Sequence, residues 1–201
     1  MDRILIELIK DGFRFQCQEC GRCCQGCGEG FVFLYDDEIK KITEFLKISY
    51  DEFLEKYTEI IESEYILYDV VSLKPTKKKT FLKSIVLKWN EETGACVFLD
   101  DKKCKIYEVR PLQCKTWPVW YYLMTKKDQF KEAREKCPGL SILDSDKSTR
   151  YYTKEEIIET LKQEVLMEQQ YINLMKKFNE NLRQIYPYLK NVKTNLDEIT
   201  K

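Results

Sequence analysis

The residues most able to do chemistry are nine cysteines, five of which stand close together in the stretch CQECGRCCQGCGEG at residues 17–30. Cysteine thiolates bind zinc and iron–sulfur clusters. The chain contains no histidine, which excludes Ser-His-Asp and Cys-His catalysis, HExxH zinc sites, histidine-dependent zinc fingers and histidine-ligated haem. A bound transition metal must therefore take mostly thiolate ligands, with carboxylates as a minor alternative.

The spacing of the first cysteines suits a metal centre. Cys17, Cys20, Cys23 and Cys24 follow the pattern C-x2-C-x2-C-C. Taking Cys27 in place of Cys24 gives the C-x2-C-x2-C-x3-C run of bacterial ferredoxins. Two-residue gaps let successive sulfurs turn towards one centre, and the glycines between them let the backbone wrap it closely. Because Cys23 and Cys24 are adjacent, they suit two separate sites or one polynuclear cluster.

Four other cysteines lie far away in the sequence, at Cys96, Cys104, Cys114 and Cys137. A metal site takes about four ligands, so folding must bring some of these to residues 17–30. Eight thiolates with one spare fit two four-ligand centres, or one centre with structural thiols. The simpler alternatives are buried, unreactive cysteines and disulfides. Cysteines packed as densely as those of residues 17–30 cannot all pair among themselves without strain, so metal binding is favoured.

Further motifs make the chain resemble a known family. They are Cys96-Val97-Phe98-Leu99, the run CKIYEVRPLQC at residues 104–114, Trp117-Pro118 and Cys137-Pro138-Gly139. In this order they resemble the CxxCxxCC or YkgJ family of zinc- or iron-chelating domains, over about residues 13 to 140. The resemblance implies a set of eight metal ligands: Cys17, Cys20, Cys23, Cys24, Cys96, Cys104, Cys114 and Cys137. Cys27 lies outside the shared motif and receives no role from it.

The leading functional hypothesis is a metal-binding protein that holds an iron–sulfur cluster or clusters, with the 4Fe-4S type favoured, and has a redox role. A structural zinc domain with a role in interactions is the first alternative, because zinc also accepts four thiolates. The second is a methyltransferase, because the resembled family includes flagellin lysine N-methylases, which use S-adenosylmethionine. The chain shows neither a phosphate-binding loop nor the C-x3-C-x2-C spacing of radical enzymes.

The composition of the chain limits its expected partners and its expected cellular location. The formal net charge of +0 argues against a nucleic-acid partner, and no apolar run is long enough to predict a membrane span. Clustered cysteines without a recognisable signal peptide indicate the cytoplasm, where thiols stay reduced. The expected partner is an unidentified protein or redox partner.

The elements that must position the cysteines can be predicted from periodicity. Helices are expected at residues 36–47 and 49–57, and a long amphipathic helix at residues 153–187. Ser49 with Glu52 and Thr153 with Glu156 predict capping boxes at the starts of the last two helices. An antiparallel strand pair is expected at residues 65–73 and 80–89. The sequence thus predicts a small α+β domain nucleated by metal, with a cysteine-cluster domain at residues 1–148 and a helical extension at residues 149–201 packed on it.

Arg110 and a group of three aromatic residues each have two possible roles. Arg110 precedes Pro111 and can face a negatively charged cluster, although an ion pair with Glu108 or Asp100 is the favoured expectation. Three aromatic side chains near the later cysteines could form a hydrophobic shell around a cluster or belong to an ordinary core. These are Tyr107, Trp117 and Trp120.

Overall fold

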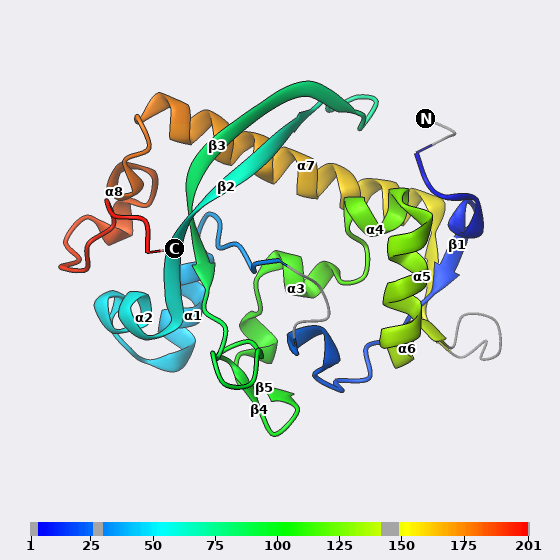
Figure 1. The fold of residues 1–201 in the computed structure, drawn as a ribbon, viewed down its shortest axis with the longest axis horizontal. Helices are drawn as coiled ribbons and strands as arrows, with labels where there is room; N and C mark the ends of the chain where they lie inside the picture. Colours follow the sequence, from blue (N-terminus) through cyan, green and yellow to red (C-terminus); the bar gives the residue numbers. More distant parts are fainter. Residues whose placement is uncertain (1–3, 26–29, 142–148, 201) are drawn as a thin grey trace.

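The computed structural model describes residues 4–25, 30–141 and 149–200, so Cys27 lies outside the described residues. The architecture is α+β, as predicted, with short helices, two-stranded antiparallel sheets and one long helix towards the C-terminus. Figure 1 shows a strand ribbon that curves along the long helix, with the shorter helices grouped on either side. Within the described ranges, no helix combines the length and apolar character needed to cross a bilayer.

The α-helices have the following bounds: α1 (Glu38–Leu46), α2 (Tyr50–Tyr57), α3 (Leu112–Thr116), α4 (Tyr121–Thr125), α5 (Lys127–Lys136), α6 (Pro138–Ser141), α7 (Lys154–Lys177) and α8 (Leu182–Ile185). The strands are β1 (Gly12–Arg14), β2 (Thr58–Tyr68), β3 (Pro75–Leu87), β4 (Leu99–Asp100), β5 (Lys103–Cys104) and β6 (Tyr151–Thr153). Short 3-10 turns complete the list: η1 (Glu7–Ile9), η2 (Arg22–Cys24), η3 (Tyr107–Val109) and η4 (Pro187–Leu189).

The β2–β3 ribbon confirms the expected antiparallel pair but begins and ends earlier than predicted. Thr58 pairs with Leu87 at one end, and the pairing continues to Tyr68 opposite Pro75. The chain turns after Tyr68 because the Asp69 carboxylate accepts hydrogen bonds from the backbone N–H and the hydroxyl of Ser72, both at 2.7 Å. Such a local turn competes with strand pairing, which explains why residues 69–73 do not extend β2.

Two of the predicted helix starts, those of α2 and α7, are confirmed by their caps. The Ser49 hydroxyl oxygen accepts a hydrogen bond from the Glu52 backbone N–H at 3.1 Å, which begins α2. Thr153 and Glu156 form the reciprocal capping box that begins α7. These contacts join residues only three positions apart, so they could be predicted from spacing alone.

The long helix ends earlier than expected. α7 stops at Lys177, whereas the apolar periodicity predicted continuation to Pro187. Asn179 and Glu180 adopt positive φ values of 48° and 57°, and the short helix α8 begins two residues later. Left-handed backbone at two consecutive residues breaks the helical hydrogen-bond ladder, so residues 182–185 keep their apolar character in a separate helix.

Two parts of the chain were not predicted in detail. Residues 121–136 form α4 and α5, of which α5 buries Phe130 and Ala133. Near the N-terminus, residues 12–14 form β1, in which Gly12 pairs with Thr153 of β6. This pairing places the start of the chain beside the start of α7.

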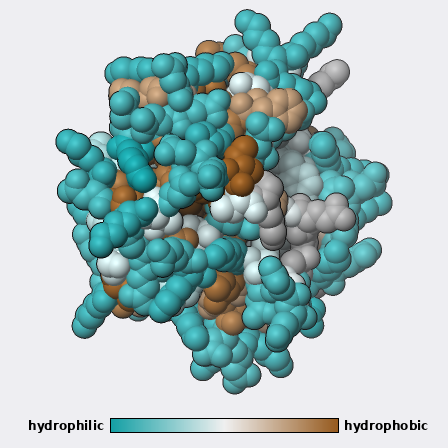
Figure 2. All heavy atoms as spheres, turned by 60° about the vertical axis from the view of Figure 1, so that its left-hand side comes forward, coloured by the Kyte–Doolittle hydropathy of each residue, from teal (hydrophilic) through white to brown (hydrophobic). Residues whose placement is uncertain are grey.

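The buried side chains form two clusters, and α7 contributes to both. The ribbon cluster gathers β2, β3, α1, α2 and the later half of α7, with central members Ile39, Phe53, Ile85, Phe98, Ile172 and Met175. The helical cluster gathers β1, α4, α5 and the earlier half of α7, with central members Phe13, Leu123, Phe130, Ile157, Leu161 and Val165. The division into domains at residue 148 stays a prediction. The face drawn in Figure 2 is covered mostly by hydrophilic side chains, with small hydrophobic areas between them.

Candidate metal centre

The cysteine-rich loop is joined directly to a distant cysteine segment. The Cys96 backbone N–H donates a hydrogen bond of 2.7 Å to the Cys24 carbonyl oxygen. Gly21, at a φ of 70°, lies against the β4–β5 hairpin, where a Cβ on it would stand 2.8 Å from the Lys102 carbonyl oxygen and 2.9 Å from Leu99 Cδ1. The loop therefore packs without spare room on the hairpin that carries Cys104.

Replacing Gly21 with alanine is expected to destabilise the protein by about 2 kcal/mol and to lower its metal content, because the new Cβ meets backbone atoms and the φ is unfavourable. Gly94→Ala is the matched control, since Gly94 has a φ of 64° but open space around its Cβ position. Urea unfolding of both variants separates crowding from backbone strain. Equal losses of stability in the two variants would show that close docking of the loop does not matter.

Five cysteines from three parts of the chain lie near the contact between the cysteine-rich loop and the Cys96 segment. They are Cys23, Cys24, Cys96, Cys104 and Cys114. Cys23 Sγ and Cys24 Sγ are 4.0 Å apart. Burial raises the pKa of Cys96 to about 11, and the neighbouring thiols Cys104 and Cys23 act in the same direction. Burial also raises the pKa of Cys114, again reinforced by neighbouring thiols. Grouped thiols of this kind resist ionisation until a cation neutralises them.

Backbone N–H groups already point at several of these sulfurs. The Phe98 N–H donates to Cys96 Sγ and the Ile106 N–H donates to Cys104 Sγ, and each hydrogen bond lowers the pKa of its thiol. The Glu19 N–H donates to Cys17 Sγ at 3.4 Å in the same two-residue relation. Such donors orient a ligand and stabilise its thiolate form.

Arg110 supplies the nearest positive charge. Its guanidinium favours ionisation of three of the gathered thiols, those of Cys23, Cys104 and Cys114. The guanidinium lies 3.7 Å from the centroid of the Tyr107 ring, and Nε donates to the Tyr107 carbonyl oxygen at 2.8 Å. Within the described residues no ion pair joins Arg110 to an acidic side chain, so the favoured expectation of an ion pair is wrong; Asp100 pairs instead with Lys105 at 3.2 Å.

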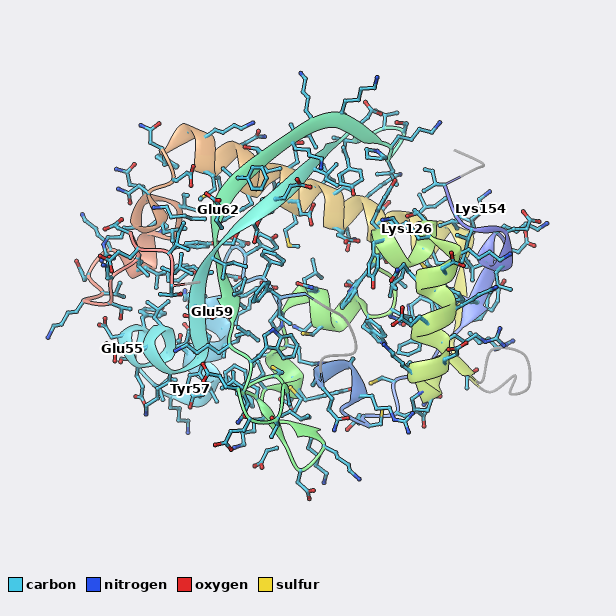
Figure 3. All side chains as sticks on the ribbon, in the orientation of Figure 1. Glu55, Tyr57, Glu59, Glu62, Lys126 and Lys154 are labelled. Carbon is cyan, nitrogen blue, oxygen red and sulfur yellow. The ribbon has the colours of Figure 1, made fainter. Side chains whose placement is uncertain are left out.

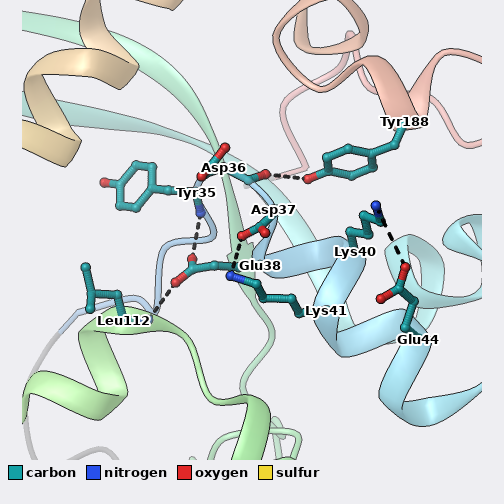
Figure 4. Close-up of polar contacts among 9 residues, drawn as sticks. All are labelled: Tyr35, Asp36, Asp37, Glu38, Lys40, Lys41, Glu44, Leu112 and Tyr188. Carbon is teal, nitrogen blue, oxygen red and sulfur yellow. Dashed lines mark hydrogen bonds and ion pairs between the residues drawn. The ribbon is translucent and has the colours of Figure 1, made fainter.

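Two polar side chains that the sequence analysis missed hold α3, which carries Cys114. Glu38 accepts hydrogen bonds from the backbone N–H groups of Tyr35 at 2.8 Å and Leu112 at 2.6 Å, as Figure 4 shows. Gln113 accepts from the Phe33 N–H and donates to the Phe31 carbonyl oxygen, both at 3.0 Å. Neither residue type is distinctive at its position, so no sequence signal could have identified them.

An aromatic stack holds the segment that carries Cys96. Phe98 lies over Tyr57 with ring centroids 4.8 Å apart and an interplanar angle of 20°. Tyr57 stands where α2 passes into β2, as Figure 3 shows. The Cys96–Phe98 segment is thus fixed against the ribbon cluster, so the position of Cys96 follows from ordinary core packing.

The remaining predicted ligands lie around the beginning of the loop. Cys17 contacts the Tyr107 side chain. Cys137 ends α5, and the neighbouring Gly139 lies directly against the Gln16 carbonyl oxygen. Cys20 is half-buried. Within residues 4–25, 30–141 and 149–200, no three cysteine, aspartate or glutamate side chains converge closely enough to hold one metal ion. The eight-ligand set therefore stays a prediction, and metal uptake requires thiol side chains to rotate.

The residues present nevertheless fit a thiolate-bound metal. The gathered donors are all sulfur, a guanidinium stands beside them, and backbone N–H groups face the sulfurs. A zinc ion bound to four thiolates at about 2.3 Å would draw the sulfurs to roughly 3.8 Å from one another. A cluster of several iron atoms accepts a wider arrangement of the same ligands.

Comparison with known proteins agrees with this geometry. A family model named CxxCxxCC, described as "Putative zinc- or iron-chelating domain", matches residues 16–138. The uncharacterized protein MJ0661 of Methanocaldococcus jannaschii is 26% identical over 163 residues, which cover 78% of this chain and 74% of the relative. No solved structure matches. The matched range contains all eight predicted ligands and more than half of the chain, and the protein belongs to the CxxCxxCC family.

Proposed function

We propose that the protein holds an iron–sulfur cluster, of the 4Fe-4S type, through thiolates drawn from its eight family cysteines, and that it works as a cytoplasmic redox protein. The observation that carries this proposal is the gathering of cysteines from the loop, the β4–β5 hairpin and α3 around Arg110. An iron–sulfur cluster with four thiolates is negatively charged, and a nearby guanidinium together with N–H donors stabilises that charge. When bound, such a cluster would accept or release one electron.

The chain's own residues would then set the conditions for electron transfer. Trp117 and Trp120 pack at 4.7 Å between ring centroids and line a cavity together with Cys23. Aromatic walls exclude water from one side of the cysteines, which influences the potential of a bound cluster. Cys17 and Cys23 are exposed, so a partner protein can approach them. We infer that the partner is another protein that exchanges electrons.

Purification without oxygen, followed by metal analysis and a visible spectrum, tests this function. The expected protein is brown, contains iron and acid-labile sulfide, and bleaches reversibly with dithionite. A colourless protein with stoichiometric zinc would overturn the redox proposal and support a structural zinc domain. Iron without acid-labile sulfide would also contradict it, because a cluster contains both.

A further inference from the structure

A cavity of about 260 Å³ lies beside Cys23, between α3, α7 and residues 30–33. Its walls include all three tryptophans of the chain, Trp89, Trp117 and Trp120. Phe33 and Tyr35 add two stacked rings with centroids 6.0 Å apart. The volume is slightly below the range of about 300–1,000 Å³ found for small-molecule sites, so a ligand with few heavy atoms would fit.

Two carboxylates from α7, Glu164 and Glu168, also line this cavity. They stand four residues apart and therefore share one face of the helix. Glu168 occupies a position of the apolar stripe formed by Leu161, Val165 and Ile172. An acidic residue in such a stripe is a sequence signal that could have drawn attention to this site.

The two carboxylates lack the partners that buried charges normally have. Glu164 accepts one hydrogen bond, from the Tyr121 backbone N–H at 2.8 Å. In the described part of the chain, neither carboxylate forms an ion pair, and Glu168 has no hydrogen-bond partner. Burial raises the pKa of Glu164 to about 8 and that of Glu168 to about 7. A cation in the cavity would supply the missing partner.

We propose that this cavity binds a small alkylammonium ion, with its charge against Glu164 and Glu168 and its alkyl groups against the tryptophan rings. Aromatic faces attract ammonium groups within about 6 Å of the ring centroid, most strongly when water is excluded. Hard divalent metal ions instead require about six or more oxygen ligands, and this cavity offers two carboxylates among mostly apolar walls. This site is separate in chemistry from the thiolate centre and goes beyond the proposed function.

Calorimetric titration of the metal-loaded protein tests the proposal, with choline as the probe and 3,3-dimethylbutanol as an uncharged analogue of the same shape. At pH 8.5, where both carboxylates are largely ionised, choline is expected to bind with a stoichiometry of one and about tenfold or more tightly than the alcohol. Because every tryptophan lines the cavity, choline is also expected to change the intrinsic fluorescence.

Glu168→Gln is expected to weaken choline binding by about tenfold or more while leaving binding of the alcohol unchanged, because it removes charge and keeps shape. Glu159→Gln is the matched control, since Glu159 lies on α7 with a side chain 63% exposed. Circular dichroism establishes that both variants are folded. Equal binding of choline and the alcohol, unchanged binding by Glu168→Gln, or displacement of choline by magnesium chloride but not by tetramethylammonium chloride would overturn the proposal.

Discussion

Replacing Cys114 with serine is expected to lower the metal content of the protein by about tenfold or more, because a serine hydroxyl does not ionise near neutral pH and cannot replace a thiolate. Cys114 interacts with three of the gathered thiols, those of Cys23, Cys96 and Cys104. Metal analysis of protein prepared without oxygen measures the change. Loss of the metal is also expected to lower the free energy of unfolding by several kcal/mol.

The matched control for this experiment is Cys27→Ser. Cys27 lies within the cysteine-rich loop but outside the family motif, so this variant is expected to keep its metal. Cys104→Ser controls for a loss of folding, because Cys104 is half-buried on a short hairpin and its replacement removes no large core side chain. If Cys114→Ser and Cys104→Ser both kept full metal content, the gathered cysteines would not be ligands.

The free energy of unfolding is expected to fall as the pH rises from about 4.5 to about 8, by roughly 2–3 kcal/mol from Glu164 and Glu168 together. Burial raises their pKa values to about 8 and about 7, whereas in the unfolded chain both titrate near 4.5. In this window the native state therefore binds more protons than the unfolded state, so raising the pH favours unfolding. This expected change in the free energy of unfolding is smaller than the two pKa shifts alone would give, because both carboxylates face a cavity connected to solvent.

Urea unfolding at pH 5, 6, 7 and 8 measures this dependence, and the difference between wild type and Glu168→Gln isolates the part due to Glu168. The variant is expected to gain stability relative to wild type as the pH rises, whereas Glu159→Gln is expected to follow wild type. Metal binding changes with pH in all three proteins alike and cancels in the difference. Parallel curves for wild type and Glu168→Gln would contradict the assignment of a raised pKa to Glu168.

Contacts between residues close together in the sequence could be predicted, whereas contacts between residues far apart in the sequence could not. The capping contacts of Ser49 and Thr153 join neighbours three positions away, and both were predicted. The contact between Cys96 and Cys24 joins residues 72 positions apart in the sequence. The spacing of the cysteines alone cannot indicate which of the distant cysteines contacts the loop in the folded protein.

The candidate metal centre shows the same dependence on sequence separation. The residue types already limited the metal ligands mostly to thiolates, and the resemblance to the family implied a set of eight cysteines. The expected ion pair of Arg110 was wrong, because the guanidinium packs on the ring of Tyr107, three residues earlier, rather than against a nearby carboxylate. The cavity was missed because its walls come from segments that meet only after β3, α3 and α7 have packed.

The participation of α7 in both hydrophobic clusters has a consequence for hydrogen exchange. Ile157, Leu161 and Val165 belong to the helical cluster, whereas Ile172 and Met175 belong to the ribbon cluster. Cooperative opening units usually follow such packed groups, but here one continuous helix connects them. Amide protons in the middle of α7 should therefore exchange only through global unfolding. Because Cys96 packs in one cluster and Cys137 in the other, a metal bound to both would merge them into one opening unit.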